Sequence, residues 1–141
     1  MISADESQVI EAFKTSFIDI LGCEPSVEEC QGLAFFYREF VRENQVQNLS
    51  RLLDPTSFHE GHVLDVLHLE KSGFLAEKVM DLGSGGGVPG LLHQMIFKKA
   101  WILCDSEKRK AEFLQRMITE YPVEGSSVVN IRAEEWLSAD G

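Results

Sequence analysis

The chain has few of the features that mark specialised classes of protein. Its three cysteines, Cys23, Cys30 and Cys104, are odd in number and lack a Cys-x-x-Cys spacing, which argues against a disulfide framework and a zinc site. Its longest apolar runs, such as residues 100–104, have five residues, whereas a membrane span needs about 20. Residues 1–6 are acidic and contain no apolar segment of a secretory signal. These absences predict a cytoplasmic protein with reduced thiols and no membrane partner.

Positive charge is also scarce. Thirteen Lys and Arg residues stand against 23 Asp and Glu residues, so the net charge is -10. This balance predicts weak non-specific attraction to polyanions, whereas a nucleic-acid-binding protein usually carries an excess of basic residues. The one dense group of cations could contact RNA phosphates or form solvated helix faces, and it consists of Lys98, Lys99, Lys108, Arg109, Lys110 and Arg116.

Residues 1–75 have the pattern of helices. Ser3 with Glu6, and Ser26 with Glu29, have the spacing of a capping box, and apolar residues follow each pair at helical intervals. Asp54 followed by Pro55 predicts another helix start. The length of 141 residues and the hydrophobic content of 44% are those of one globular unit. We therefore expect a helical N-terminal region within one compact unit.

From residue 76 to residue 141 the pattern alternates between strands and helices. We expect strands at 78–82, 100–104 and 127–131, helices at 89–97 and from Ser106 (as the N-cap) to 121, and a helical turn at 134–137. This order predicts three parallel strands. The predicted fold class is α/β, in which the helical region packs on half of a Rossmann-like, doubly wound parallel sheet.

A glycine-rich bend, Gly83-Ser84-Gly85-Gly86-Gly87, joins the first predicted strand to a helix. Such a bend lets the backbone approach a ligand and leaves the helix amides pointing at it. The spacing Asp81-x-Gly83-x-Gly85-x-Gly87 fits a loop that binds S-adenosylmethionine. The spacing Gly85-x-Gly87-x-x-Gly90 fits a dinucleotide fingerprint, which is a weaker signal. A glycine-rich turn without a ligand is the third interpretation.

Two acidic residues help to choose between these cofactors. Asp105 ends the second predicted strand, where a carboxylate can accept both ribose hydroxyls of an adenosine, as either cofactor requires. Asp81 lies at the end of the first strand, where an acid suits a cationic sulfonium-amino acid and would repel a pyrophosphate. The residues therefore favour S-adenosylmethionine. Its site would lie at the sheet that the predicted strands from residue 78 onward form.

Three segments resemble one family, the bacterial 16S ribosomal RNA guanine-N7 methyltransferases, also called glucose-inhibited division protein B. Asn44-Gln45-Val46-Gln47-Asn48-Leu49-Ser50 is similar to the family's Asn-x-x-x-Asn-Leu-Thr. Asp81-Leu82-Gly83-Ser84-Gly85-Gly86-Gly87-Val88-Pro89-Gly90 is similar to its Asp-Leu-Gly-Ser-Gly-x-Gly-x-Pro-Gly, and Arg132-Ala133-Glu134-Glu135 to its Arg-Ala-Glu-Glu. The resemblance implies a class I, S-adenosylmethionine-dependent RNA methyltransferase.

The resemblance also implies roles for particular residues. Gly83 and Val88 would line the methionine end of the cofactor, Ala133 and Glu134 would frame the adenine, and Asp105 would bind the ribose. The complete set expected to bind cofactor is Asp81, Gly83, Ser84, Gly85, Gly87, Val88, Asp105, Ser106, Ala133 and Glu134. Guanine N7 has a free lone pair at neutral pH, so we expect no catalytic acid or base and no metal. The implied partner is 16S rRNA or the small ribosomal subunit.

The sequence departs from the family pattern in two places. In His62-Val63-Leu64-Asp65-Val66-Leu67, Val66 replaces a serine of the family. The family pattern also includes a fourth strand, which pairs with the first strand. These 141 residues do not contain it. We therefore expect a chain that is a piece of a longer protein, or one that self-associates through the exposed edge of its first strand. A non-catalytic module that binds S-adenosylmethionine or another adenosine ligand, and an NAD-binding oxidoreductase domain, are the alternatives.

Overall fold

The computed structural model describes residues 3–73 and 77–132. Five helical segments come first: α1 (Ala4–Leu21), α2 (Val27–Asn44), α3 (Pro55–Phe58), the π-helix η1 (His59–Val63) and α4 (Leu64–Ser72). Strands and helices then alternate: β1 (Val79–Leu82), α5 (Gly90–Phe97), β2 (Trp101–Cys104), α6 (Lys108–Glu120) and β3 (Ser127–Val129). The α/β class is confirmed, and so is a helical N-terminal region that precedes a parallel sheet.

The predicted helix starts are confirmed by their caps. Ser3 Oγ accepts a hydrogen bond from the Glu6 amide at 3.1 Å, and Asp54 caps α3 in the same way with Pro55 at its first position. At α2, Ser26 and Glu29 satisfy each other's backbone amides, at 3.0 and 2.7 Å. Such caps satisfy amides that have no partner within the helix.

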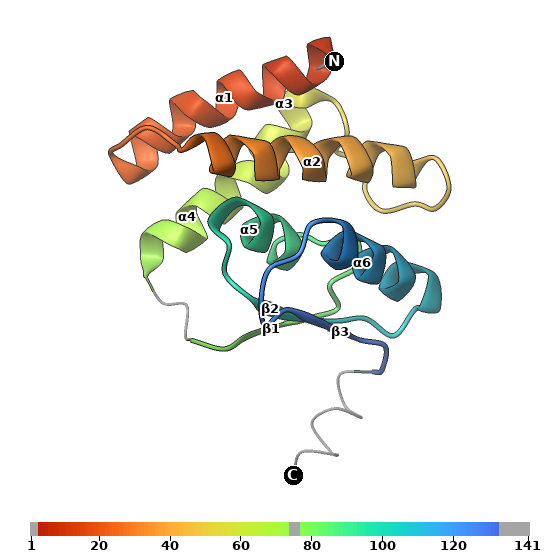
Figure 1. Cartoon of the computed structure of the whole chain (residues 1–141). Coiled ribbons are helices and arrows are strands. Elements are labelled where there is room, and N and C mark those ends of the chain that lie inside the picture. The colour runs from red at the N-terminus through yellow and green to blue at the C-terminus, as the bar shows by residue number, and fades with distance from the viewer. Residues whose placement is uncertain (1–2, 74–76, 133–141) are drawn as a thin grey trace.

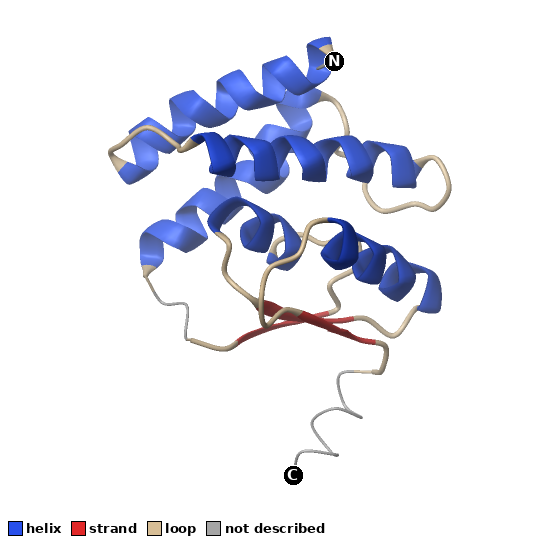
Figure 2. Cartoon of the chain, viewed as in Figure 1, coloured by secondary structure: helices blue, strands red, loops and turns tan. Residues whose placement is uncertain are grey.

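The strands form a parallel sheet in the order β1-β2-β3. Leu82 pairs in register with Cys104, and Cys104 pairs with Val129, so the carboxyl ends of the strands meet at one edge. The helices α5 and α6 lie over one face of this sheet, with α4 beside α5, and α1 and α2 form a further layer beyond them (Figures 1 and 2). The N-terminal region thus reaches the sheet mainly through α5, against which α2 packs.

Several predicted boundaries differ from the structure. The strands begin at Val79 and Trp101, one residue later than predicted, and β3 ends at Val129, two residues earlier. The prediction of Ser106 as N-cap of the following helix is wrong: Glu107 takes that position, because the Asp105 side chain accepts from the Glu107 amide and keeps the chain extended there. The predicted turn at 134–137 lies outside the described residues.

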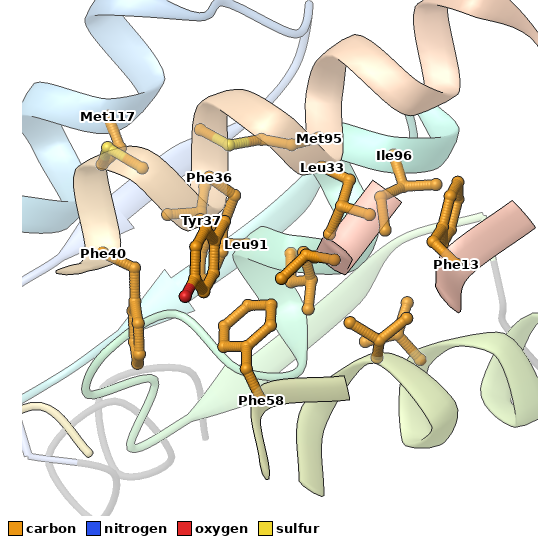
Figure 3. Packing of buried hydrophobic residues seen from close by; sticks show 14 of the residues in the cluster. Phe13, Leu33, Phe36, Tyr37, Phe40, Phe58, Leu91, Met95, Ile96 and Met117 are labelled. Atoms are coloured by element: carbon orange, nitrogen blue, oxygen red, sulfur yellow. The ribbon is translucent and has the colours of Figure 1, made fainter. Parts of the chain in front are cut away.

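Aromatic side chains fill the space between the helical layers. Phe58 is fully buried, and its ring contacts those of Phe36, Tyr37 and Phe40, with centroids between 4.8 and 6.2 Å away (Figure 3). Gly32 lets α2 approach α5 closely, since a Cβ placed there would meet the Met95 carbonyl oxygen at 2.0 Å. This packing fixes the position of α5 and of the bend that precedes it.

Ion pairs join α2 to α6 at one side of the core. The Arg116 guanidinium bonds Glu39 at 2.9 Å and Glu43 at 3.1 Å, and the Glu39 side chain is almost fully buried. Burial is the largest single influence on the pKa of Arg116 and lowers it. The hydrogen bonds and charges of the neighbouring Glu carboxylates together outweigh burial, so the pKa of Arg116 is raised. The pairs fix α6, and with it the loop that follows β2, relative to the helical layer.

Candidate cofactor site

The glycine bend continues the pairing of β1 with β2. The amides of Gly83 and Ser84 both donate to the Cys104 carbonyl oxygen at 2.8 Å. Ser84 is buried, its Oγ donates to the Asp81 carbonyl oxygen at 2.8 Å, and the same Oγ accepts from the Cys104 amide at 3.1 Å. The Ser84 side chain is therefore engaged within the fold and holds the first residues of the bend against β2.

Two glycines of the bend serve different purposes. Both have left-handed backbone angles, with φ of +77° at Gly83 and +91° at Gly87, which residues with a Cβ rarely adopt. A Cβ at Gly83 would meet no heavy atom within 4 Å, so the backbone there faces open space. A Cβ at Gly87 would press on Leu91 at 2.9 Å and on Phe36 at 3.2 Å, so the absence of a side chain there serves core packing.

Asp105 ties the bend to the end of β2. Its side chain accepts from the Gly85 amide at 2.7 Å and from the Glu107 amide at 2.9 Å, one bond to each carboxylate oxygen. The residue is only 7% exposed. A carboxylate has about four acceptor positions, so these two bonds leave capacity for hydroxyl donors of a ligand.

A pocket of about 520 Å³ opens at the carboxyl edge of the sheet, where the three strands end. It is lined by Leu82, Gly83, Cys104, Asp105, Ser106, Glu107, Ile131 and Arg132. The structure thus brings together three residues of the predicted set, Gly83, Asp105 and Ser106. The volume of the pocket lies within the range of small-molecule sites. A buried carboxylate beside an open glycine backbone fits an adenosine ligand.

The remaining predicted residues lie elsewhere. Ser84, Gly85 and Gly87 belong to the bend and Val88 follows it, but none of them lines this pocket; Ala133 and Glu134 lie outside the described residues. For these six residues a role in cofactor binding stays a prediction. Sequence reasoning missed five lining residues, namely Leu82, Cys104, Glu107, Ile131 and Arg132. These five residues lie at or just after the predicted ends of the three strands. Because parallel strands end at one edge of a sheet, their positions in the sequence could have identified them.

Asp81 turns its carboxylate towards the start of α5. Its Oδ2 accepts from the Gly90 amide at 3.0 Å, and a Cβ at Gly90 would meet this carboxylate at 2.6 Å. Burial raises the pKa of Asp81, the nearby charge of Asp105 raises it further, and the hydrogen bond from Gly90 opposes both. The side chain thus caps α5, and its expected place beside a cationic ligand group stays a prediction.

The segment with the Asn-x-x-x-Asn-Leu-Ser pattern lies against the bend. Asn44 Oδ1 accepts from the amides of Leu49 and Ser50, at 2.7 and 3.0 Å, which closes the loop after α2. Leu49 then lies so close to Gly86 that a Cβ on that glycine would be 3.1 Å from the Leu49 Cβ. The loop therefore supports the bend from the helical side.

The histidines of this region are engaged in the core. His59 and His62 have their pKa lowered by burial, and their Nε2 atoms lie 2.8 Å from Ser16 Oγ and 3.2 Å from Ser50 Oγ. Within residues 3–73 and 77–132, no three His, Cys, Asp or Glu side chains are grouped to hold a metal ion. The described site combines the Gly83 backbone, the buried carboxylate of Asp105 and walls of mixed polar and apolar residues.

Comparison with known proteins gives consistent matches. The sequence model of the family described as rRNA small subunit methyltransferase G matches residues 29–140. A protein of that name from Synechococcus elongatus is 34% identical over 126 residues, which cover 86% of this chain and 52% of the relative. One from Mycoplasma mycoides is 31% identical over 105 residues, covering 73% of this chain and 77% of the relative.

A third relative of the same name, from Cellvibrio japonicus, is 32% identical over 124 residues, or 84% of this chain and 57% of the relative. The chain spans about half the length of the curated relatives from Synechococcus and Cellvibrio. The range 29–140 that the family model matches includes the three segments at 44–50, 81–90 and 132–135 that carried the resemblance. The chain belongs to the rRNA small subunit methyltransferase G family.

Proposed function

We propose that this chain binds S-adenosylmethionine at the glycine bend and forms the cofactor-binding part of an rRNA methyltransferase. The observation that carries the proposal is the pocket at the carboxyl edge of the sheet, which joins the open backbone of Gly83 to the buried carboxylate of Asp105. Membership of the family supports the same reaction, because the matched relatives are named as methyltransferases of small-subunit rRNA.

In this proposal each group in the pocket has a binding task. Asp105 accepts hydrogen bonds from the ribose hydroxyls while it keeps its own bonds to Gly85 and Glu107. Gly83 lets the ligand approach the backbone, and Ser106 lies beside Asp105 in the pocket wall. The proposed set also retains Asp81, Ser84, Gly85, Gly87, Val88, Ala133 and Glu134.

S-adenosylmethionine, when bound, supplies a methyl group on a positively charged sulfur. Guanine N7 attacks with a free lone pair, so the chain needs no side chain that removes a proton. The task left to the protein is to hold two reactants in line, which can lower a barrier by about 7–11 kcal/mol. The acidic surroundings at Asp81 and Asp105 suit this cation better than the pyrophosphate of NAD.

The proposed substrate is 16S rRNA, free or within the small ribosomal subunit, and the proposed compartment is the cytoplasm. None of the helices in the described residues is long and apolar enough to cross a membrane. Among the described residues, β1 pairs with β2 on one side only, so we also propose that its other side can pair with a second copy. Light scattering that gives a monomer mass at high concentration would contradict this pairing.

Isothermal titration calorimetry tests the cofactor. S-adenosylmethionine and its demethylated product should bind to the chain, and NAD should not. Binding of NAD with no response to the other two ligands would overturn the proposal in favour of an oxidoreductase domain.

Transfer of a labelled methyl group tests the reaction. The acceptor should be ribosomal RNA from cells that lack the modification, offered both free and as small subunits. Label in the RNA supports the methyltransferase, whereas tight cofactor binding without any label identifies a binding module that does not catalyse transfer.

A further inference from the structure

A second and larger cavity lies beside the proposed cofactor pocket. It has a volume of about 620 Å³ and lies between the loop after α2 and the first turn of α6. We call it the α2–α6 groove, and its lining residues are Asn44, Gln45, Val46, Gln47, Asn48, Glu107, Lys108, Arg109 and Lys110. Glu107 lines both cavities, so the groove and the cofactor pocket adjoin at the carboxyl edge of the sheet.

The groove concentrates positive charge in an acidic chain. Three consecutive cations line it, with Glu107 as the one acidic lining residue, whereas the whole chain has a net charge of -10. The Lys108 side chain is 83% exposed, and its ion pair with Glu112 is long, at 4.0 Å. Lys110 pairs with Glu107 at 2.6 Å. The groove can therefore attract an anion locally, although the net charge of the whole chain is negative.

The two walls of the groove are tied together. Gln47 Nε2 donates to the Arg109 carbonyl oxygen at 3.1 Å, and the Arg109 guanidinium donates to the Val46 carbonyl oxygen at 2.9 Å. A guanidinium has five N–H donors, so this bond leaves others that can reach a ligand. Walls held in this way need little rearrangement when a ligand binds, which favours affinity.

We propose that the α2–α6 groove binds the sugar–phosphate backbone of the RNA whose target base approaches the cofactor held in the neighbouring pocket. This inference rests on the proposed function. Lys108, Arg109 and Lys110 supply cations for phosphates, and four amide side chains supply donors and acceptors that suit 2′-hydroxyls and base edges. Val46 is the only apolar side chain among the lining residues, so the groove has little that would fit an apolar segment of a protein.

The test compares two double variants with the same change of charge. Lys108→Gln with Lys110→Gln removes two cations from the groove. Lys14→Gln with Lys78→Gln removes two others: Lys14 is on α1 and half exposed beside Glu11, and Lys78 is exposed just before β1, at the opposite edge of the sheet. The probe is a fluorescently labelled single-stranded RNA of mixed sequence, titrated at several salt concentrations.

The groove variant should bind this RNA at least about fivefold more weakly, and the slope of its salt dependence should fall by about 1.4, because two phosphate contacts to a single strand are lost. The control variant should change affinity by less than about twofold, since Lys14 and Lys78 do not line the groove and salt screens exposed charges that are remote from a ligand. Equal losses in both variants would overturn the inference, because net charge would then explain the binding.

Calorimetry with S-adenosylmethionine on the same samples separates this inference from the proposed function. If the unaltered chain binds the cofactor but not the RNA probe, the groove proposal is wrong and the cofactor proposal stands. If the chain binds RNA through the groove but not the cofactor, the proposed function fails instead. Retained cofactor affinity in each variant shows that a loss of RNA binding does not result from unfolding.

Discussion

The helical layers and the carboxyl edge of the sheet are held by different interactions. Between the helices, Phe36, Phe40 and Phe58 pack ring against ring and exclude water. At the edge, a few hydrogen bonds fix the loops: the side chains of Asp105 and Asn44 each accept two from backbone amides. Burial of an aromatic side chain contributes several kcal/mol, whereas one hydrogen bond contributes about 1 kcal/mol net. We infer that the aromatic core provides most of the free energy of folding. The carboxyl edge of the sheet contributes less to it and keeps polar groups available to a ligand.

The strongest test of this contrast is a pair of truncations. Phe58→Ala should lower the free energy of unfolding by about 4 kcal/mol, because it leaves a cavity among the buried rings of Phe36, Tyr37 and Phe40. Leu82→Ala should change it by less than about 0.5 kcal/mol, because Leu82 is 46% exposed in the cofactor pocket. Denaturant unfolding measures both, and a larger loss for Leu82→Ala would contradict the contrast.

A smaller effect is expected from closing the helix contact at Gly32. Gly32→Ala places a methyl group against the backbone of α5, so we expect a loss of about 1–3 kcal/mol from overpacking. Gly61→Ala is the matched control, since its new methyl group would meet only the end of the Leu52 side chain, which is partly exposed and can move. Thermal unfolding of both variants provides the measurement. Equal stability of the two variants would show that α2 and α5 can separate at little cost.

The smallest effect is a pH dependence that arises in the core. Trp101 Nε1 donates to His93 Nδ1 at 3.1 Å, so the ring proton is on Nε2, which faces Glu70 at 2.9 Å. Burial lowers the pKa of His93, against the opposing hydrogen bond of Glu70. The unfolded chain, with a histidine pKa of about 6.5, therefore binds more protons than the folded chain as the pH falls.

The stability contributed by a neutral His93 is thus complete above about pH 6.5 and decreases as the pH falls towards the lowered folded pKa. His93→Gln should reduce the slope of unfolding free energy against pH in that window. It should not abolish the slope, because burial also lowers the pKa of His59 and His62. An unchanged slope in the variant would show that His93 does not titrate with folding.

Local patterns in the sequence predicted the elements and the bend well. Ser3, Ser26 and Asp54 cap helices because their side chains reach amides only three residues away, and such contacts are visible in sequence spacing. Asp105 was also placed correctly, at the end of β2 beside the bend. Its binding of a ribose stays a prediction.

Long-range contacts were not predictable in this way. The approach of Gly32 to Met95 depends on how two helices cross, and the cap that Asp81 provides for α5 depends on the path of the bend. The groove at Arg109 likewise requires two segments that lie some 60 residues apart in the chain. The error at Ser106 is local instead: the bond from the Glu107 amide to Asp105, two residues earlier, competes with the cap expected from Ser106.

The central claim concerns the Asp105 carboxylate, and calorimetry on two matched variants tests it most directly. Asp105→Asn removes the charge of the buried carboxylate in the pocket, whereas Asp81→Asn removes the charge of the carboxylate that caps α5 outside it. Asp105→Asn should weaken the binding of S-adenosylmethionine by at least tenfold, about 1.4 kcal/mol, while Asp81→Asn should weaken it less. Undiminished affinity in Asp105→Asn, with Asp81→Asn showing the larger loss, would contradict the account.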